Sequence, residues 1–226
     1  MSEQPFNQIR ETRVCAGPEA AARLRELGVS QGRLDEALDA GDVAARQATI
    51  FSPVNAAGMY RWLETVTRLR TGLAADGWQA KDPNNSPRIV HPSGRTVIVA
   101  ASGNARTGLD DGDPRTARAR GTTSFRSVQL NAEQLELNLG LAAVIHDMSA
   151  ETGTSELMWF LLYHRTEDEL RAELSLPFRM SVKGHVDSWR ERILLPSRTF
   201  DSGLVRPLDV LDDGGTDVAF DVVARG

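Results

Sequence analysis

LMWFLLYHRTEDELRAELSL, residues 157–176, contains the clearest strand signal in this chain. The first part, Leu157 to His164, is a continuous apolar run, which is typical of a strand buried on both faces. The last part, Glu169 to Leu176, alternates apolar with charged or small polar residues, the period of a strand with two unlike faces. Arg165 to Asp168 has the composition of a turn. The stretch therefore predicts two consecutive strands of a sheet.

Shorter strand signals flank this stretch on both sides. Arg88 to His91 and Arg95 to Ala101 are β-type runs joined by Pro92-Ser93-Gly94, so we expect them to form a hairpin. Toward the C-terminus, further strands are predicted at residues 178–182, 192–195, 205–211 and 217–224, the last two pairing across an Asp-Asp-Gly-Gly turn.

Helical spacing dominates the first third of the chain. Pro18 suits the first turn of a helix that Gly28 stops. Ser30 is a good cap for a second helix, which we expect to end at Gly41. A third helical stretch is then predicted over residues 42–50, with Asp42 as its cap.

A longer amphipathic helix is predicted from about Val54 to Ala75, and a further helix over residues 127–148. Together these patterns predict an α+β fold, with N-terminal helices followed by a largely antiparallel β-sheet that carries one long polar loop. We expect a flexible N-terminus (residues 1–16), a helical region (17–77) and a mixed, mainly antiparallel β domain (78–226) that packs with the helices as one unit.

The overall charge restricts the classes of partner. The chain of 226 residues has a net charge of −5, which disfavours coating of nucleic acid or anionic membrane by bulk electrostatics. Only Lys81 and Lys183 among the basic residues are lysines, an arginine bias typical of a GC-rich bacterial genome. A single arginine is therefore weak evidence for phosphate recognition.

The single cysteine and the N-terminal sequence indicate the compartment. Cys15 is the only cysteine, so an internal disulfide and a four-cysteine zinc site are excluded. Residues 1–13 lack the apolar core of a signal peptide, and no run approaches the roughly 20 apolar residues of a membrane span. We expect a soluble cytoplasmic protein without membrane association.

Ser102 to Gly121, which we name the Arg/Asp loop, is a long glycine-rich polar segment. Loops of this length are usually functional or disordered. Its start, SGNARTG, is similar to the first half of a phosphate loop. The positions that require lysine and serine or threonine hold Leu109 and Asp110, so an ordinary phosphate-loop ATPase or GTPase is disfavoured.

The charges of this loop suggest another use. Its arginines could hold a phosphate or carboxylate through paired hydrogen bonds. The plainer interpretation, which the sequence favours, is a solvated loop in which arginines and Asp110, Asp111 and Asp113 neutralise one another. The candidate ligand- or partner-binding residues are Asn104, Arg106, Thr107, Arg115, Thr116, Arg118 and Arg120. We predict no catalytic residue, no metal ligand and no cofactor.

Other patterns in the sequence are weaker evidence for a particular function. Leu24 to Leu38 has the spacing of a helix-turn-helix, but its second helix brings Asp35, Glu36 and Asp39, which phosphate would repel. The four histidines are scattered, and Cys15 lies in the segment expected to be flexible, which makes it a poor candidate nucleophile.

Several motifs resemble an uncharacterised family of bacterial proteins. They are Gly77-Trp78, NNSPRIVHPSG at 84–94, GNARTG at 103–108 and RAELSLP at 171–177. The resemblance covers about Leu24 to Pro196 and implies no activity and no functional residue. The family pattern has an acidic pair after the first loop glycine and a lysine before the last. This chain has Asn104-Ala105 and Arg120 there, which further disfavours a metal-dependent mechanism.

The sequence therefore predicts a non-enzymatic binding or regulatory protein of a bacterial cytoplasm. It would present the Arg/Asp loop to a partner protein or small anion, with nucleic acid a less favoured partner. The alternative is a hydrolase or nuclease acting on a phosphate-containing substrate, which requires acidic residues converging in a concave pocket. No oligomeric state is indicated.

Overall fold

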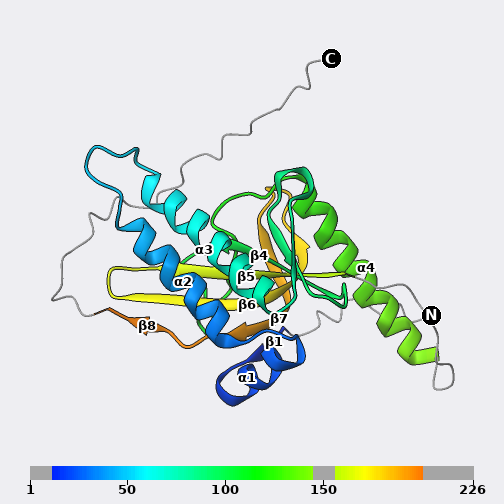
Figure 1. Ribbon diagram of the computed structural model, residues 1–226. Coiled ribbons are helices and arrows are strands. Elements are labelled where there is room, and N and C mark those ends of the chain that lie inside the picture. The colour runs from blue at the N-terminus through cyan, green and yellow to red at the C-terminus, as the bar shows by residue number, and fades with distance from the viewer. Residues whose placement is uncertain (1–11, 145–155, 201–226) are drawn as a thin grey trace.

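The computed structural model describes residues 12–144 and 156–200, with the side chains of 134–144 omitted (Figure 1). The strands predicted at 205–211 and 217–224 lie outside the described residues, as do residues 1–11 of the N-terminus. No helix within the described ranges is long and apolar enough to cross a bilayer.

An open sheet of eight strands forms the centre of the molecule. The order of its strands is β1-β7-β6-β5-β4-β3-β2. The eighth strand, β8, pairs with β6 and is not part of this linear order. The pairs β1–β7 and β4–β5 are parallel, and all others are antiparallel. The strands are β1 (Arg13–Cys15), β2 (Gln79–Lys81), β3 (Arg88–Val90), β4 (Thr96–Ser102), β5 (Leu157–Arg165), β6 (Glu169–Met180), β7 (Val186–Leu194) and β8 (Arg198–Thr199). This confirms the predicted α+β class with a mostly antiparallel sheet.

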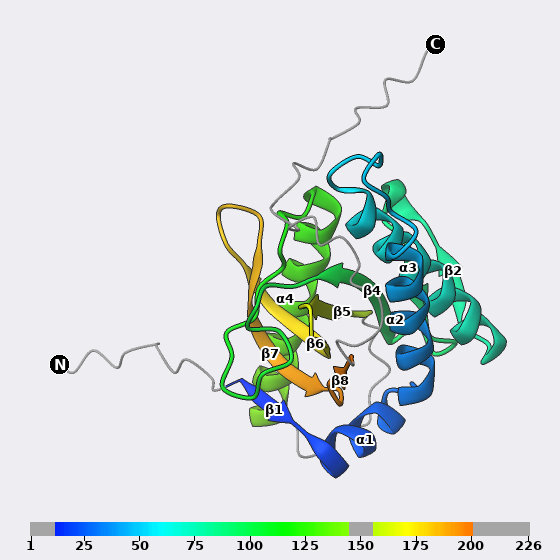
Figure 2. The same cartoon turned by 90° about the vertical axis from the view of Figure 1, so that its left-hand side faces the viewer.

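Helices cover both faces of this sheet. They are α1 (Gly17–Glu26), α2 (Gln31–Ala45), α3 (Ala56–Ala75) and α4 (Thr122–Val144), with a short 3-10 turn at Pro83–Asn85. The helices α2 and α3 lie side by side (Figure 1), and Figure 2 shows them and α4 on opposite sides of the central strands. The parallel pair β4–β5 requires a crossover, and the Arg/Asp loop and α4 form it.

The position of β5 between two hydrophobic cores explains why its residues form a continuous apolar run. Trp159 and Leu161 belong to the core beneath α1 to α3, whereas Phe160 and Leu162 belong to the core beneath α4. Successive side chains of a strand point to opposite faces, so a strand covered on both faces must be apolar throughout. Strands β5 and β6 are the two consecutive strands predicted from residues 157–176, and they pair in an antiparallel manner, with Phe160 opposite Ser175.

One predicted helix boundary is wrong. Helix α2 does not end at Gly41 but continues to Ala45, and residues 42–50 form no separate helix. A Cβ added at Gly41 would lie 2.1 Å from Thr65 Oγ1 and 2.7 Å from Arg61 O, both on α3. Gly41 is therefore required by the close approach of two helices and does not act as a stop signal.

The expectation of a flexible N-terminus is wrong for its last residues. Arg13 to Cys15 form β1, which pairs in parallel with Glu191 to Ile193 of β7, and Cys15 is fully buried. A three-residue strand is too short to show the alternation of apolar and polar residues, so the sequence does not predict β1. The structure shows it through its pairing with β7.

Candidate functional site

The Arg/Asp loop leaves the end of β4 and leads into the first turn of α4. The loop consists of a first leg (residues 102–107), a central turn (108–112) and, after Asp113, a second leg (114–121). The two legs pair near the sheet, because Gly103 and Thr116 form a β-bridge and Asn104 N donates to Arg115 O at 3.0 Å. The legs thus continue the sheet for a short distance before the loop becomes irregular.

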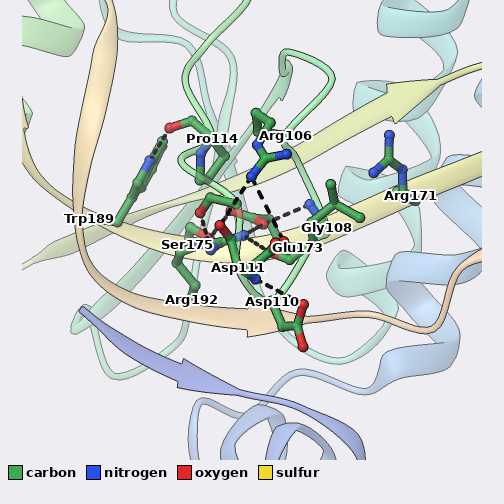
Figure 3. A network of polar contacts seen from close by, with 12 residues as sticks. Arg106, Gly108, Asp110, Asp111, Pro114, Arg171, Glu173, Ser175, Trp189 and Arg192 are labelled. Carbon is green, nitrogen blue, oxygen red and sulfur yellow. Dashed lines mark hydrogen bonds and ion pairs between the residues drawn. The ribbon is translucent and has the colours of Figure 1, made fainter. Parts of the chain in front are cut away.

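A buried ion pair lies directly beneath the loop (Figure 3). Arg192 Nη2 is 2.5 Å from Glu173 Oε2, and the two side chains are 3% and 0% exposed. Arg192 Nε also donates to Glu173 Oε1 at 3.1 Å, and Ser175 Oγ donates to the same oxygen at 2.8 Å. A charge pair at this depth is tolerated only when its other hydrogen-bonding positions are satisfied.

The loop backbone satisfies those positions. Gly108 N donates to Glu173 Oε2 at 2.9 Å. Arg192 donates to Gly112 O through Nη1 and to Leu109 O through Nη2, both at 2.7 Å. Figure 3 shows these bonds converging on the pair from one turn of the loop. Residues 108–112, which have no regular structure, are therefore fixed to β6 and β7.

Three further contacts hold the loop outside this turn. Trp189 Nε1 donates to Pro114 O at 2.6 Å, and Arg171 Nη2 donates to Ala105 O at 2.9 Å. On the second leg, Thr116 Oγ1 accepts from Val186 N at 3.1 Å. The sheet thus contacts both legs of the loop as well as its central turn.

The predicted residues Asn104, Thr107 and Thr116 help to fix the shape of the loop. Asn104 Oδ1 accepts from Arg106 N at 3.3 Å and from Arg115 N at 3.2 Å. Thr107 and Thr116 are buried, and Thr107 packs so closely on Gly103 that a Cβ there would lie 2.1 Å from Thr107 Oγ1. The side chains of Asn104 and Thr107 are thus directed to the loop itself, whereas Thr116 Oγ1 is directed to β7.

The four predicted arginines differ in exposure. Arg106 and Arg115 are exposed, whereas Arg118 and Arg120 are partly buried. Arg106 Nη2 donates to Asp111 O at 3.2 Å, so it links the first leg to the central turn. The guanidinium of Arg120 lies over the Phe160 ring, 5.8 Å from its centroid.

The two legs carry different charges. The exposed acids Asp110, Asp111 and Asp113 lie on the central turn and its exit, whereas the leg from Arg115 onward carries only basic charges. This leg lies beside the β6–β7 turn, since Arg120 N donates to Gly184 O at 2.8 Å, and the exposed Lys183 precedes that glycine. The loop thus has a basic side.

Glu173 and Arg192 were not among the predicted residues. The only signal for them in the sequence is that both are charged residues within strands. Glu173 lies opposite Leu162 of β5, whose side chain belongs to the core beneath α4. The side chain of Glu173 therefore points to the same face of the sheet. The loop covers that side.

Cys15 is fully buried in this fold. Its Sγ lies 3.4 Å from Glu19 Oε1. Burial, together with the hydrogen bond to Glu19, raises the pKa of Cys15 to about 11, so the thiol is protonated at neutral pH. Among the side chains that the structure describes, those of residues 12–133 and 156–200, no group of three or more His, Cys, Asp or Glu is placed to share a metal ion.

Comparisons with known proteins return no family model, no curated protein and no solved structure that matches this chain. The resemblance to an uncharacterised bacterial family therefore stays a prediction.

Proposed function

We propose that this protein is a non-enzymatic binding or regulatory protein that recognises a phosphate or carboxylate group of a partner through the basic side of the Arg/Asp loop. The observation that carries the proposal is the attachment of Gly108, Leu109 and Gly112 to the buried Glu173–Arg192 pair. A loop ordered before binding loses little entropy when a ligand arrives. Loops held on a rigid scaffold are common recognition elements.

The leg from Arg115 onward supplies suitable hydrogen-bond donors. Arg115 is exposed, as is Lys183 in the β6–β7 turn. Arg118 and Arg120 follow Arg115 on the leg, which lies beside that turn. Guanidinium groups donate two parallel hydrogen bonds to phosphate or carboxylate oxygens. Since the whole chain is acidic, attraction of an anion must come from this local arrangement.

Two neighbouring features restrict where an anion would sit. The exposed acids on the central turn would repel it, which favours the side away from Asp110 and Asp111. The basic leg ends at Thr122, the first residue of α4, and the positive end of a helix dipole attracts negative charge. Both effects favour the same side of the loop.

The proposal is tested by binding of pyrophosphate and a poly-glutamate peptide, measured by calorimetry at low and moderate salt. The variant Arg115→Ala/Lys183→Ala should bind at least tenfold more weakly, since a charge-assisted hydrogen bond contributes about 1.5–3 kcal/mol. The matched control Arg25→Ala/Arg95→Ala removes two exposed positive charges elsewhere and should bind like wild type. Equal binding by all three proteins at low salt contradicts the proposal.

The second hypothesis, a hydrolase or nuclease, uses the same anion and differs in turnover. The same proteins can be assayed for release of phosphate and for cleavage of DNA and RNA. Turnover that disappears in Arg115→Ala/Lys183→Ala but persists in the control would replace the binding proposal by the enzymatic one.

A further inference from the structure

The second notable surface lies on the other side of the molecule, on the helices α2 and α3. The inner sides of these helices pack on the sheet through Leu34, Leu38, Leu69 and Leu73, all buried. Glu173, beneath the Arg/Asp loop, faces the opposite core. Any partner on the outer side of α2 and α3 is therefore separate from a ligand of the loop.

Exposed apolar side chains are concentrated here. Eight of the eleven exposed large apolar residues in the described ranges lie between Val43 and Leu63. Val43 is 62% exposed, Leu63 57% and Met59 52%. Single exposed apolar residues are ordinary, whereas a contiguous group marks an interaction surface.

Three of these side chains, Val43, Tyr60 and Leu63, line an open groove of about 780 Å³ between the two helices. On α2 it is lined by Ala40, Val43 and Ala44, which recur at helical spacing, and on α3 by Tyr60 and Leu63. The small alanines let another backbone approach closely, and the larger side chains form walls. The groove thus has the shape that a third helix would fill.

The charges at one end of the groove favour a basic partner. Acidic groups outnumber basic ones there even when the existing ion pairs of Arg33 with Glu36 and of Arg198 with Asp39 are included. The charged residues that line the groove are Glu36, Asp39 and Glu64 against Arg68, and the ion pairs of these residues add Asp35 and Asp76 against Arg33 and Arg198. Lysine or arginine near one end of a docked helix would be attracted to this excess.

The same excess disfavours two other occupants. A second copy would bring an equal surplus of carboxylates, in a chain whose net charge is −5. The segment 201–226 of this chain contains six aspartates and two arginines. Neither matches an acidic groove in charge.

We propose that the α2–α3 groove binds an amphipathic helix of a partner protein, with an apolar stripe against Val43, Tyr60 and Leu63 and basic residues at the end near Glu36 and Glu64. Helix α2 has 15 residues and is about 22 Å long at 1.5 Å per residue, so the docked helix would have about four turns.

The test uses the full chain and designed helical peptides of 16 residues. One peptide carries leucines at helical spacing and lysines at one end, a second has the same composition in scrambled order, and a third replaces the lysines with glutamates. Fluorescence anisotropy should show the first peptide binding at least tenfold more tightly than the other two. Equal binding of all three overturns the proposal.

Matched variants locate the binding on the protein. Val43→Gln/Leu63→Gln should weaken binding of the leucine–lysine peptide at least tenfold, whereas Val182→Gln, at a fully exposed valine in the β6–β7 turn, should not. Glu64→Gln should weaken it and reduce its salt dependence, unlike Glu133→Gln on α4. Far-UV circular dichroism and melting curves should show that these surface variants are folded.

The remaining outcomes assign the groove to another occupant. Sedimentation that reveals a dimer lost in Val43→Gln/Leu63→Gln would identify a second copy. Tighter binding of a synthetic 201–226 peptide than of the leucine–lysine peptide would identify the chain's own C-terminal segment. Either result overturns the proposal without affecting the pyrophosphate test of the Arg/Asp loop.

Discussion

Glu173 of β6 and Arg192 of β7 form an ion pair beneath the Arg/Asp loop, and their remaining hydrogen bonds go to the backbone of residues 108–112. Stability of the sheet and order of the loop are therefore linked. If either charge is lost, the other stays buried without its partner, and the loop loses an attachment at the same time.

Glu173→Gln should accordingly destabilise the protein by about 3 kcal/mol or more, the usual result of leaving one charge of a buried pair uncompensated. Denaturant unfolding measures the loss. Adding Arg192→Met to this variant removes the unpaired charge, and part of the loss should then be recovered. A single variant within about 1 kcal/mol of wild type would show that the pair is not a structural unit.

Gly41 provides a test of helix packing against helix propensity. Alanine is about 1 kcal/mol more favourable than glycine in an exposed helix interior, so propensity alone predicts that Gly41→Ala stabilises the fold. The contacts with Thr65 and Arg61 predict the reverse, a loss of about 1–3 kcal/mol from overpacking.

Gly32→Ala, on the same helix, is the matched control. A Cβ there would meet only Ser30 Oγ, at 3.9 Å, so this change should leave stability unchanged or raise it. Thermal melts of both variants separate the explanations. Stabilisation by Gly41→Ala would mean that the two helices can move apart at little cost.

Asp42 makes part of the stability depend on pH. Its carboxylate lies 2.9 Å from Arg46 Nη2 and 3.0 Å from Arg165 Nε, which connects α2 to β5. Burial alone would raise the pKa of Asp42, but hydrogen bonds from Arg46 and Arg165 and the positive charges of Arg165 and Arg61 outweigh it and lower the pKa.

A lowered pKa in the folded state means that Asp42 stabilises the fold above its unfolded pKa of about 3.9 and that this contribution disappears as the pH falls through the folded value. The difference in unfolding free energy between wild type and Asp42→Asn should thus be largest near neutral pH and shrink toward pH 2. A difference independent of pH contradicts the assignment.

The sequence was informative where the signal is local. The first strand of residues 157–176 is predicted from a continuous apolar run and the second from alternation, and both signals are local. The cap at Ser30 is predicted because a serine before a helix can bond a backbone amide only a few residues away, and it accepts from Arg33 N. Gly41 was misread, since a glycine that ends a helix and one that admits a neighbouring helix look alike in sequence. Only the position of α3 distinguishes them.

The binding role of the candidate residues stays a prediction. Arg106 and Arg115 are exposed on the loop, as a binding role requires, but the sequence did not indicate that Asn104 and Thr107 shape the loop. It also did not identify Glu173, because alternation in a strand shows which residues share a face and not what covers that face. The folded loop covers it.

Cys15 tests the N-terminal strand directly, because it is the only cysteine and any thiol signal comes from it. With the pKa raised to about 11, the thiolate fraction at pH 8 is on the order of one in a thousand, and the side chain is fully buried. A thiol reagent such as Ellman's reagent should therefore label the native protein only as fast as β1 detaches, and label it at once in urea.

Glu19→Gln removes one cause of the raised pKa and leaves the burial of Cys15, so it should accelerate labelling only modestly. Immediate labelling of the native protein at pH 8 would mean that residues 13–15 are not held against β7, and the flexible N-terminus expected from the sequence would extend to α1.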